Sequence, residues 1–137
     1  MTHPGLGHVL DIRVEFDLDL DNPALSGARG FLRASGGALS GSGIDAVVDP
    51  QAGDWTLRQP DGTLLNDQRI WFTLPDGGHI YMRSLGVTQA DGRFHCTPRF
   101  DTAAGPLDWL TRTVFIGAGH LDAQGCAFSV YRLEDQR

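Results

Sequence analysis

The stretch LDIRVEFDLDL, residues 10–20, alternates apolar and charged side chains without interruption. Every apolar residue in it has an even number and every charged residue an odd one. Successive side chains of a β-strand point to opposite faces, whereas a helix would spread these apolar residues around its circumference. The pattern therefore predicts a long strand with one face in a core and the other in water.

The dipeptide Asp-Gly recurs at a regular interval further along the chain. It stands at residues 61–62, 76–77 and 91–92, so fifteen residues separate each copy from the next. Asp-Gly is a hairpin signal, because a type I′ turn needs positive φ at both central residues and this pair adopts it with little strain. The three dipeptides predict hairpin turns of this type in an antiparallel meander with strands at 64–74, 79–87 and 93–100.

The rest of the chain adds further strands. They are expected near residues 29–34, 39–48, 110–118 and 126–133, with room for a short helical turn only in 101–109. Strands without helices to cover them must bury their apolar faces on one another. We therefore predict an all-β fold, a closed or nearly closed antiparallel β-barrel of eight or nine strands, lipocalin-like and with little helix, formed by residues 1–137 as a single domain. A barrel of about eight strands has an interior wide enough for one small ligand.

The composition agrees with strands joined by tight turns. All eleven basic residues are arginine, fifteen of the seventeen acidic residues are aspartate, and the chain holds 18 Gly and 7 Pro. Lysine, which favours helices, is absent. The net charge of −6 excludes a nucleic-acid or anionic-membrane partner, since phosphate binding needs a positive field. Without an export signal or an apolar run of ~20 residues, we expect a cytoplasmic protein in which Cys96 and Cys126 are reduced core thiols.

Reversals at the predicted turns assign residues to the two ends of the barrel. Counting strands in both directions from the turn at 76–77 puts the loops 19–28, 49–53 and 101–108 at the same end as that turn. Several side chains capable of chemistry follow these loops directly. We expect them to converge on one mouth, with Arg69 deeper in the barrel: Arg29, Asp54, Trp55, His79, Tyr81, Trp109 and Arg112.

The order and spacing of short motifs along the chain carry a family resemblance. These motifs are Gly36-Gly37, Gly53-Asp54-Trp55, Asp61-Gly62, Asp76-Gly77, Ile80-Tyr81, Trp109-Leu110-Thr111-Arg112, Gly117-Ala118-Gly119 and Val130-Tyr131, with Arg29, Arg69 and Gly86. With them, the sequence resembles the domain-of-unknown-function family DUF3237 over nearly its whole length. The resemblance implies a small antiparallel barrel, commonly dimeric. For some fungal relatives it also implies a link to polyketide pathways, in which a carbonyl-rich chain is hydrolysed or cyclised.

Asp54 is the first candidate for acid–base chemistry. A carboxylate at the mouth of an apolar cavity has its pKa raised by desolvation and serves as general base or acid, with Trp55 as an apolar wall. The alternative is that Gly53-Asp54 completes a tight turn. Arg29 and Arg69 are suited to hold anionic oxygens of a substrate, because a guanidinium offers paired planar donors. Their alternative is a structural ion pair between one arginine and Asp54.

Tyr81 completes the candidate catalytic set with Asp54 and Arg29. Its hydroxyl is suited to donate to a developing oxyanion, or, as the alternative, to close a structural hydrogen bond. The histidines show no metal-ligand spacing, so we expect neither a metal nor another cofactor. The candidate substrate contacts are Trp55, Arg69, His79, Trp109 and Arg112, of which Trp109 also fits the core.

These residues lead to two hypotheses about function, beside the possibility of a dimer whose cavity is filled by its own side chains. The first is a cofactor-independent enzyme that acts on a carbonyl-rich, aromatic or polyketide-like compound by acid–base chemistry in the barrel mouth. Hydrolysis, cyclisation or isomerisation would be the outcome. The alternative is a non-catalytic barrel that binds a small ligand. In either case we expect a homodimer with a small-molecule partner, and neither nucleic acid nor a membrane.

Overall fold

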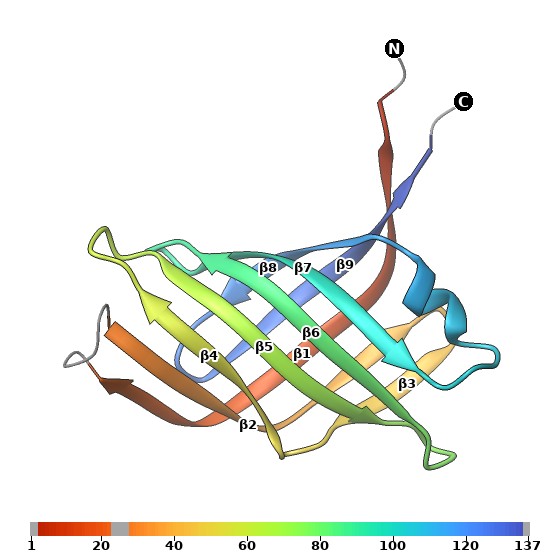
Figure 1. Cartoon of the computed structure of the whole chain (residues 1–137), viewed down its shortest axis with the longest axis horizontal. Coiled ribbons are helices and arrows are strands. Elements are labelled where there is room, and N and C mark those ends of the chain that lie inside the picture. The colour runs from red at the N-terminus through yellow and green to blue at the C-terminus, as the bar shows by residue number, and fades with distance from the viewer. Residues whose placement is uncertain (1–2, 23–27, 136–137) are drawn as a thin grey trace.

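The computed structural model describes residues 3–22 and 28–135, and in this part of the chain nine strands form one antiparallel sheet (Figure 1). Eight strands close into a barrel in the order β1-β2-β4-β5-β6-β7-β8-β9, and β9 pairs again with β1; β3 is an extra strand that pairs with β2 and β5. The predicted all-β barrel is thereby confirmed. The elements are β1 (Gly5–Asn22), β2 (Ala28–Gly41), β3 (Ile44–Val48), β4 (Ala52–Arg58), β5 (Leu64–Thr73), β6 (His79–Thr88), β7 (Arg93–Thr102), the 3-10 helix η1 (Asp108–Arg112), β8 (Phe115–Leu121) and β9 (Gly125–Glu134).

The alternation in β1 places one face of that strand in the core. Leu10, Ile12, Val14 and Phe16 are buried, and the charged residues between them are exposed. The other strands alternate in the same way, so that their inward side chains fill the barrel with apolar groups. The aromatic residues of this core are Phe16, Phe72, Phe94, Phe100, Phe115 and Phe128.

The three Asp-Gly dipeptides form hairpin turns, but these are not of type I′. At the turn of residues 76–77, the Gly77 N–H donates to the Leu74 carbonyl (2.9 Å) and the Leu74 N–H donates to the Gly78 carbonyl (2.8 Å). Positive φ is confined to the glycine of each pair, because Ser42 is the one non-glycine residue with positive φ in the described ranges. The aspartate side chain instead accepts the N–H two residues further on, as Asp76 does from Gly78 (2.8 Å). The hydrogen bond from Leu74 to Gly78 thus encloses three turn residues, one more than the two of a type I′ turn, and the prediction of type I′ is wrong.

The segment of residues 28–48 differs from the prediction in a way that reverses part of the barrel. Residues 28–41 form one continuous strand, and the chain turns back at Ser42 (φ 52) and Gly43 (φ 75). β3 and β4 then both run antiparallel to β2, so residues 49–51 do not reverse the chain. As a result, Arg29 lies beside Leu57, at the end of the barrel with the turns at 61–62 and 91–92. The prediction that it lies at the other end is wrong.

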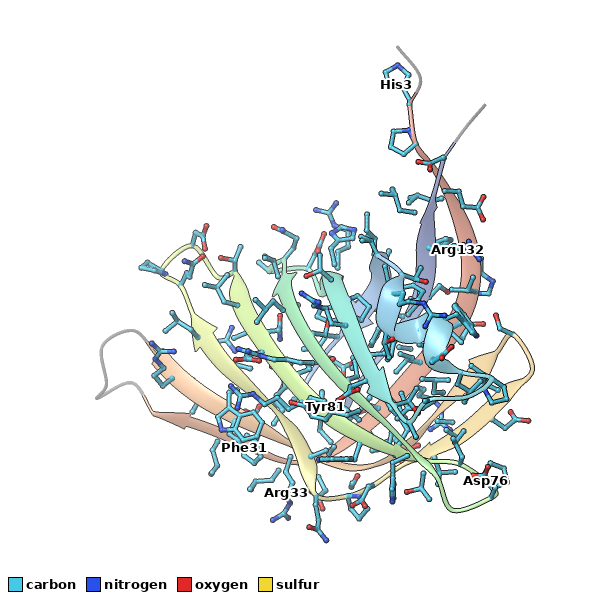
Figure 2. All side chains as sticks on the ribbon, turned by 45° about the vertical axis from the view of Figure 1, so that its right-hand side comes forward. His3, Phe31, Arg33, Asp76, Tyr81 and Arg132 are labelled. Atoms are coloured by element: carbon cyan, nitrogen blue, oxygen red, sulfur yellow. The ribbon has the colours of Figure 1, made fainter. Side chains whose placement is uncertain are left out.

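The two ends of the barrel are otherwise easy to identify. Asp76 marks a turn at one end, and Arg132 marks β9, which projects with β1 beyond the barrel wall at that same end (Figure 2). The turns at 61–62 and 91–92 are at the other end. A helical turn is present as η1, but it spans Asp108–Arg112 and overlaps the predicted range 101–109 only at its first two residues. The strand predicted for residues 110–118 begins only at Phe115, because the preceding residues belong to η1 and the link after it. No helix in the described ranges is long and apolar enough to cross a membrane.

Candidate functional site

Asp54 lies inside the barrel, in the middle of β4. Its side chain is 0% exposed, and it accepts hydrogen bonds from Asn66 Nδ2 (2.8 Å), Gln68 Nε2 (3.2 Å) and the backbone N–H of Asp67 (3.1 Å). No arginine forms an ion pair with it within residues 3–22 and 28–135. The alternatives of a tight turn and of an Asp54–arginine bridge therefore do not describe this residue. It is a buried carboxyl group held by neutral donors.

Burial controls the protonation of Asp54. Desolvation raises the pKa of this carboxyl from its usual value of 3.8 to about 6, although the hydrogen bonds from Asn66, Gln68 and the Asp67 backbone favour the ionised form. The negative charge of Asp67 nearby adds to the increase. The carboxyl group therefore changes its charge around pH 6, within the range that suits a general acid or base.

A hydrogen-bonded chain connects Asp54 with the end of the barrel that holds the turns at 61–62 and 91–92. Thr88 Oγ1 donates to Asn66 Oδ1 (2.8 Å), and Asn66 in turn donates to Asp54. Gln68 also contacts Cys126 Sγ (3.6 Å). Two buried atoms of this polar interior, Gln68 Oε1 and Ser84 Oγ, have no hydrogen-bond partner among the described residues. The barrel interior around Asp54 therefore contains several polar side chains, although apolar side chains would fill the same space without needing hydrogen-bond partners.

A pocket of about 310 Å³ opens at this same end of the barrel. Its inner residues include Leu32 and Thr56, which adjoin Asp54: Leu32 pairs with Asp54 across the sheet, and Thr56 is the next inward residue on β4. Asp54 is therefore in the layer next to the pocket. The charged and titratable residues that line the pocket are Asp19, Asp21, Arg58, Asp91, His120 and Asp122.

The predicted convergence of the site residues on the end with the Asp76 turn is wrong. Neighbouring residues of a strand point to opposite faces, so Trp55 points outward because Asp54 points inward. Arg29 and Arg69 are likewise on the outer face, and both are exposed. The structure does bring Trp55 and Arg69 together, with the guanidinium carbon 5.4 Å from the indole centroid.

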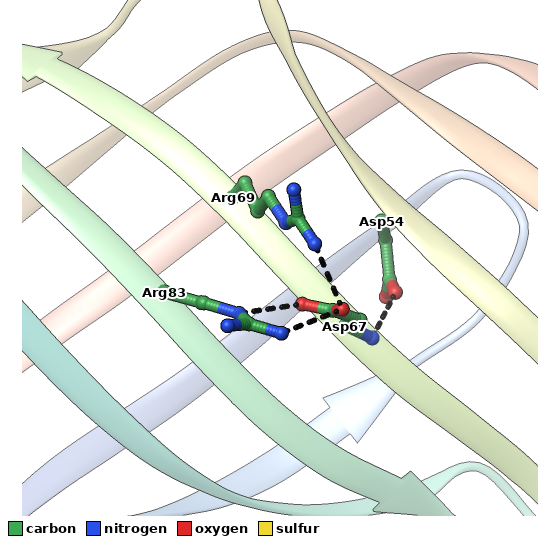
Figure 3. Close-up of polar contacts among 4 residues, drawn as sticks. All are labelled: Asp54, Asp67, Arg69 and Arg83. Carbon is green, nitrogen blue, oxygen red and sulfur yellow. Dashed lines mark hydrogen bonds and ion pairs between the residues drawn. The ribbon is translucent and has the colours of Figure 1, made fainter.

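The structural ion pairs expected near Asp54 involve its neighbour Asp67 instead (Figure 3). Arg69 and Arg83 both contact Asp67 Oδ2, at 3.4 and 3.2 Å. Partial burial opposes ionisation of Asp67, but the hydrogen bonds from Arg83 and Arg69 outweigh it and lower the pKa of this carboxyl. Asp54 and Asp67 thus have opposite pKa shifts, one inside and one outside the barrel wall.

The remaining predicted residues lie at the end with the Asp76 turn. Tyr81 packs against Trp71 on the outer face, with ring centroids 5.1 Å apart, and His79 packs against the same indole at 6.1 Å. Trp109 packs against the core residue Phe115 at 6.2 Å. Arg112 forms an ion pair with Asp108 (3.1 Å). None of these four residues lines the pocket near Asp54.

Comparison with known proteins agrees with this architecture. The family described as "Protein of unknown function (DUF3237)" matches residues 4–95 and 88–133, which is most of the sequence. The chain belongs to the DUF3237 family. No protein with a curated description matches it.

Several solved structures share the fold of this DUF3237 protein. A conserved protein of unknown function from Rhodopseudomonas palustris is 19% identical, with a TM-score of 0.87 over 97% of this chain and 99% of the other. A beta-barrel like protein from Acinetobacter baumannii is 20% identical, with a TM-score of 0.84 over 96% and 97%. An enzyme from Penicillium herquei is 18% identical, with a TM-score of 0.78 over 98% and 97%. One neighbour of this DUF3237 barrel is thus described as an enzyme.

Sequence reasoning missed the polar partners of Asp54 in this DUF3237 barrel. Asn66 and Gln68 occupy inward positions of β5, between the buried Leu64 and Ile70. Two polar residues at the apolar positions of an alternating strand are a detectable signal, because such residues need buried partners. Thr56 and Thr88 follow the same rule on β4 and β6.

The two cysteines are free and buried, which confirms the prediction of reduced core thiols. Burial raises the pKa of the Cys96 thiol to about 11 and that of the Cys126 thiol to about 12. Only the thiolate is strongly nucleophilic, and very little of it forms at neutral pH. Neither thiol is therefore a candidate nucleophile in this DUF3237 barrel.

Thr88→Val tests whether the chain between the pocket and Asp54 contributes to stability. Valine has the same shape but leaves the buried Asn66 Oδ1 without its donor, so we expect the free energy of unfolding to fall by about 1–3 kcal/mol. Thr97→Val is the matched control: its hydroxyl is on the exposed face and donates to the Leu85 carbonyl (3.3 Å), so a change within about 0.5 kcal/mol is expected. Urea unfolding measures both values, and equal losses would contradict the expectation.

Proposed function

We propose that this protein is a cofactor-independent enzyme that binds a small carbonyl compound in the pocket near Asp54 and uses that carboxylate as a general base. The observation that carries the proposal is a fully buried carboxyl group, without a cationic partner among the described residues and with a pKa of about 6, in the layer next to a pocket. Its three hydrogen-bond partners all donate, so they favour the ionised form that accepts a proton.

The proton transfer we propose begins at the carbon next to a carbonyl group. The substrate would have to enter past Leu32 and Thr56, the pocket residues that adjoin Asp54, to bring its C–H bond into contact with the carboxylate. The C–H bond then breaks, the proton goes to the Asp54 carboxylate, and the electron pair moves to the carbonyl oxygen to form an enolate. Thr56, on the same inward face of β4, lines the pocket, and its hydroxyl is suited to donate to the enolate oxygen. Return of the proton to another atom completes an isomerisation, and attack of the enolate on a second carbonyl completes a cyclisation.

The charges around the pocket favour a neutral or cationic substrate. Asp19, Asp21, Asp91 and Asp122 surround its opening, against the single guanidinium of Arg58. A carboxylate ligand would be repelled by this field, whereas an uncharged diketone or aromatic ketone would not. Because Arg69 and Arg29 point away from the barrel interior, the proposal does not use them to hold the substrate.

Deuterium uptake measures this chemistry directly. Neutral diketones such as acetylacetone are incubated with the protein in heavy water, and exchange next to the carbonyl is followed by mass spectrometry. We expect exchange to rise with pH around the Asp54 pKa of about 6, and Asp54→Asn to lower kcat by at least about 100-fold. Asp67→Asn is the matched control: it keeps the backbone N–H that donates to Asp54, so the rate at high pH should be retained, and only the pH at which exchange rises should fall, because the charge of Asp67 is removed. Unchanged exchange in the Asp54 variant would exclude the proposed base.

The second candidate is a non-catalytic ligand-binding barrel. Its support is that Asp54 is 0% exposed and is separated from the pocket by one layer of side chains. In this case a small molecule is expected to remain bound during purification, to be seen by native mass spectrometry, and to stay chemically unchanged on incubation. Asp54→Asn would then alter its affinity little and its chemistry not at all.

A further inference from the structure

A groove lies on the outside of the barrel where β7 and β8 separate. These strands pair only between residues 93–96 and 117–120, although β7 continues to Thr102 and β8 begins at Phe115. The helix η1 lies beside the opening, at the end of β7 (Figure 1). The groove between the three elements has a volume of about 530 Å³. It is separate from the pocket near Asp54, since the two share no lining residue.

The lining of this groove is apolar with two positive charges. Phe100, Leu110 and Phe115 are buried within it, and Val114 and Ile116 are 65% and 37% exposed at its edge. Its charged residues are Arg99 and Arg112, and none of the described residues that line it is acidic. In a chain of net charge −6, a groove without any carboxylate is selectively suited to an anion.

Arg99 stands at the end of a row of arginines. Arg69, Arg83 and Arg99 are directly opposite one another on β5, β6 and β7. Like charges at such positions destabilise a sheet. Asp67 compensates Arg69 and Arg83, whereas no carboxylate of the described residues forms an ion pair with Arg99. The sheet therefore holds an uncompensated guanidinium at the edge of an apolar groove.

Arg112 is able to bind an anion together with Arg99, because its present ion pair with Asp108 is weak. Its ion pair with Asp108 joins exposed side chains four residues apart, with 66% and 36% of their surfaces accessible. Such exposed pairs contribute little to stability in water. An anion in the groove that is shielded by Phe100 and Val114 would bind this guanidinium more strongly than the exposed Asp108 does.

We propose that the groove between β7, β8 and η1 binds an amphipathic anion, whose acidic head group contacts Arg99 and Arg112 and whose apolar body covers Phe100, Val114 and Ile116. The pocket near Asp54 has the opposite charge, because four aspartates surround its opening. The two sites thus select ligands of different charge. The groove does not depend on the function proposed for Asp54.

Decanoate is the probe, and decyltrimethylammonium, with an equally long chain and a positive charge, is its control ligand. Calorimetry measures affinity, and methyl signals of Val114 and Ile116 report the place of binding by NMR. We expect decanoate to bind with shifts at these methyl groups. Arg99→Gln or Arg112→Gln should weaken it by about tenfold or more, as expected for loss of a charge-assisted hydrogen bond. Arg93→Gln, on the same strand but outside the groove, should leave the affinity unchanged.

Folding of the Arg99 variant is checked by its thermal midpoint. This midpoint should not fall, because the substitution removes a like charge opposite Arg83. Three results would each overturn the proposal: equal affinity for the cationic ligand, binding that is unaffected by both arginine substitutions, or NMR shifts confined to residues of the pocket near Asp54. Binding by the anion alone, with loss in both variants, supports it.

Discussion

Replacing Asp54 by asparagine is expected to stabilise the protein increasingly as the pH rises. The difference in unfolding free energy between the variant and the wild type should move in favour of the variant by about 3 kcal/mol between about pH 3 and about pH 8. The figure follows from the rise of the Asp54 pKa from 3.8 to about 6, at about 1.4 kcal/mol for each unit. Urea unfolding at a series of pH values measures it.

The sign of this effect follows from where the proton is held more tightly. The folded protein binds the Asp54 proton more tightly than the unfolded chain does, so protonation favours folding. That contribution is complete below the unfolded pKa of 3.8 and is lost as the pH rises through about 6. Asparagine cannot ionise, and its amide can still accept from Asn66 or Gln68, so the variant does not bury a charge at high pH.

Asp67→Asn is the control for the direction of the pH dependence. The pKa of Asp67 is lowered in the folded protein, so its contribution to stability is present above the unfolded pKa and is lost on acidification. The variant should therefore be less stable than the wild type at neutral pH, and the difference should disappear in acid. Parallel pH curves for the Asp54 and Asp67 variants would contradict the assignment of Asp54 as a buried carboxyl group with a raised pKa.

Gly37→Ala is expected to have the second large effect, a loss of about 4 kcal/mol in unfolding free energy. Gly37 has φ +132, a conformation that a residue with a side chain rarely adopts. A Cβ at this position would also collide with the Arg13 carbonyl and lie 2.9 Å from Val14 Cα, both on the backbone of β1. Since backbone cannot rotate away as a side chain does, the β1–β2 pairing must shift. Chemical unfolding measures the loss.

Gly77→Ala separates conformational strain from collision. Gly77 also has positive φ, +88, but a Cβ there would have nothing within 4 Å. We expect a loss of only about 1–2 kcal/mol, from the left-handed conformation alone. If both alanine variants lost the same stability, close approach of β1 and β2 at Gly37 would not be a constraint on the barrel.

The strands were predictable because their signals are local. The period of two in residues 10–20 and the regular Asp-Gly turns depend only on neighbours in the chain, and both are present in the structure. The course of β2 was not predictable in the same way. Two glycines at 36–37 look like a reversal, but pairing with β1 holds them within one strand, and the chain turns at Ser42 instead. The prediction also counted a reversal at residues 49–53, where β3 and β4 in fact run in the same direction, and this extra reversal put Arg29 at the wrong end.

The candidate site was predictable only in part. Asp54 was predicted as an acid–base candidate, and the structure places it next to a pocket, but Trp55 and Arg69 could not share its face, because adjacent residues alternate. Its actual partners, Asn66 and Gln68, come from the neighbouring strand β5. Their polar side chains at apolar positions were visible in the sequence, whereas the identity of the group they bind was not.

Local order along the chain was enough to specify an antiparallel barrel, its hairpins and the residue types available for chemistry. The protonation of Asp54, the end at which its pocket opens and the groove beside Arg99 depend on closure of the barrel. Closure removes water from a carboxyl group and aligns residues from distant parts of the chain, and both effects arise from contacts between strands rather than from sequence neighbours.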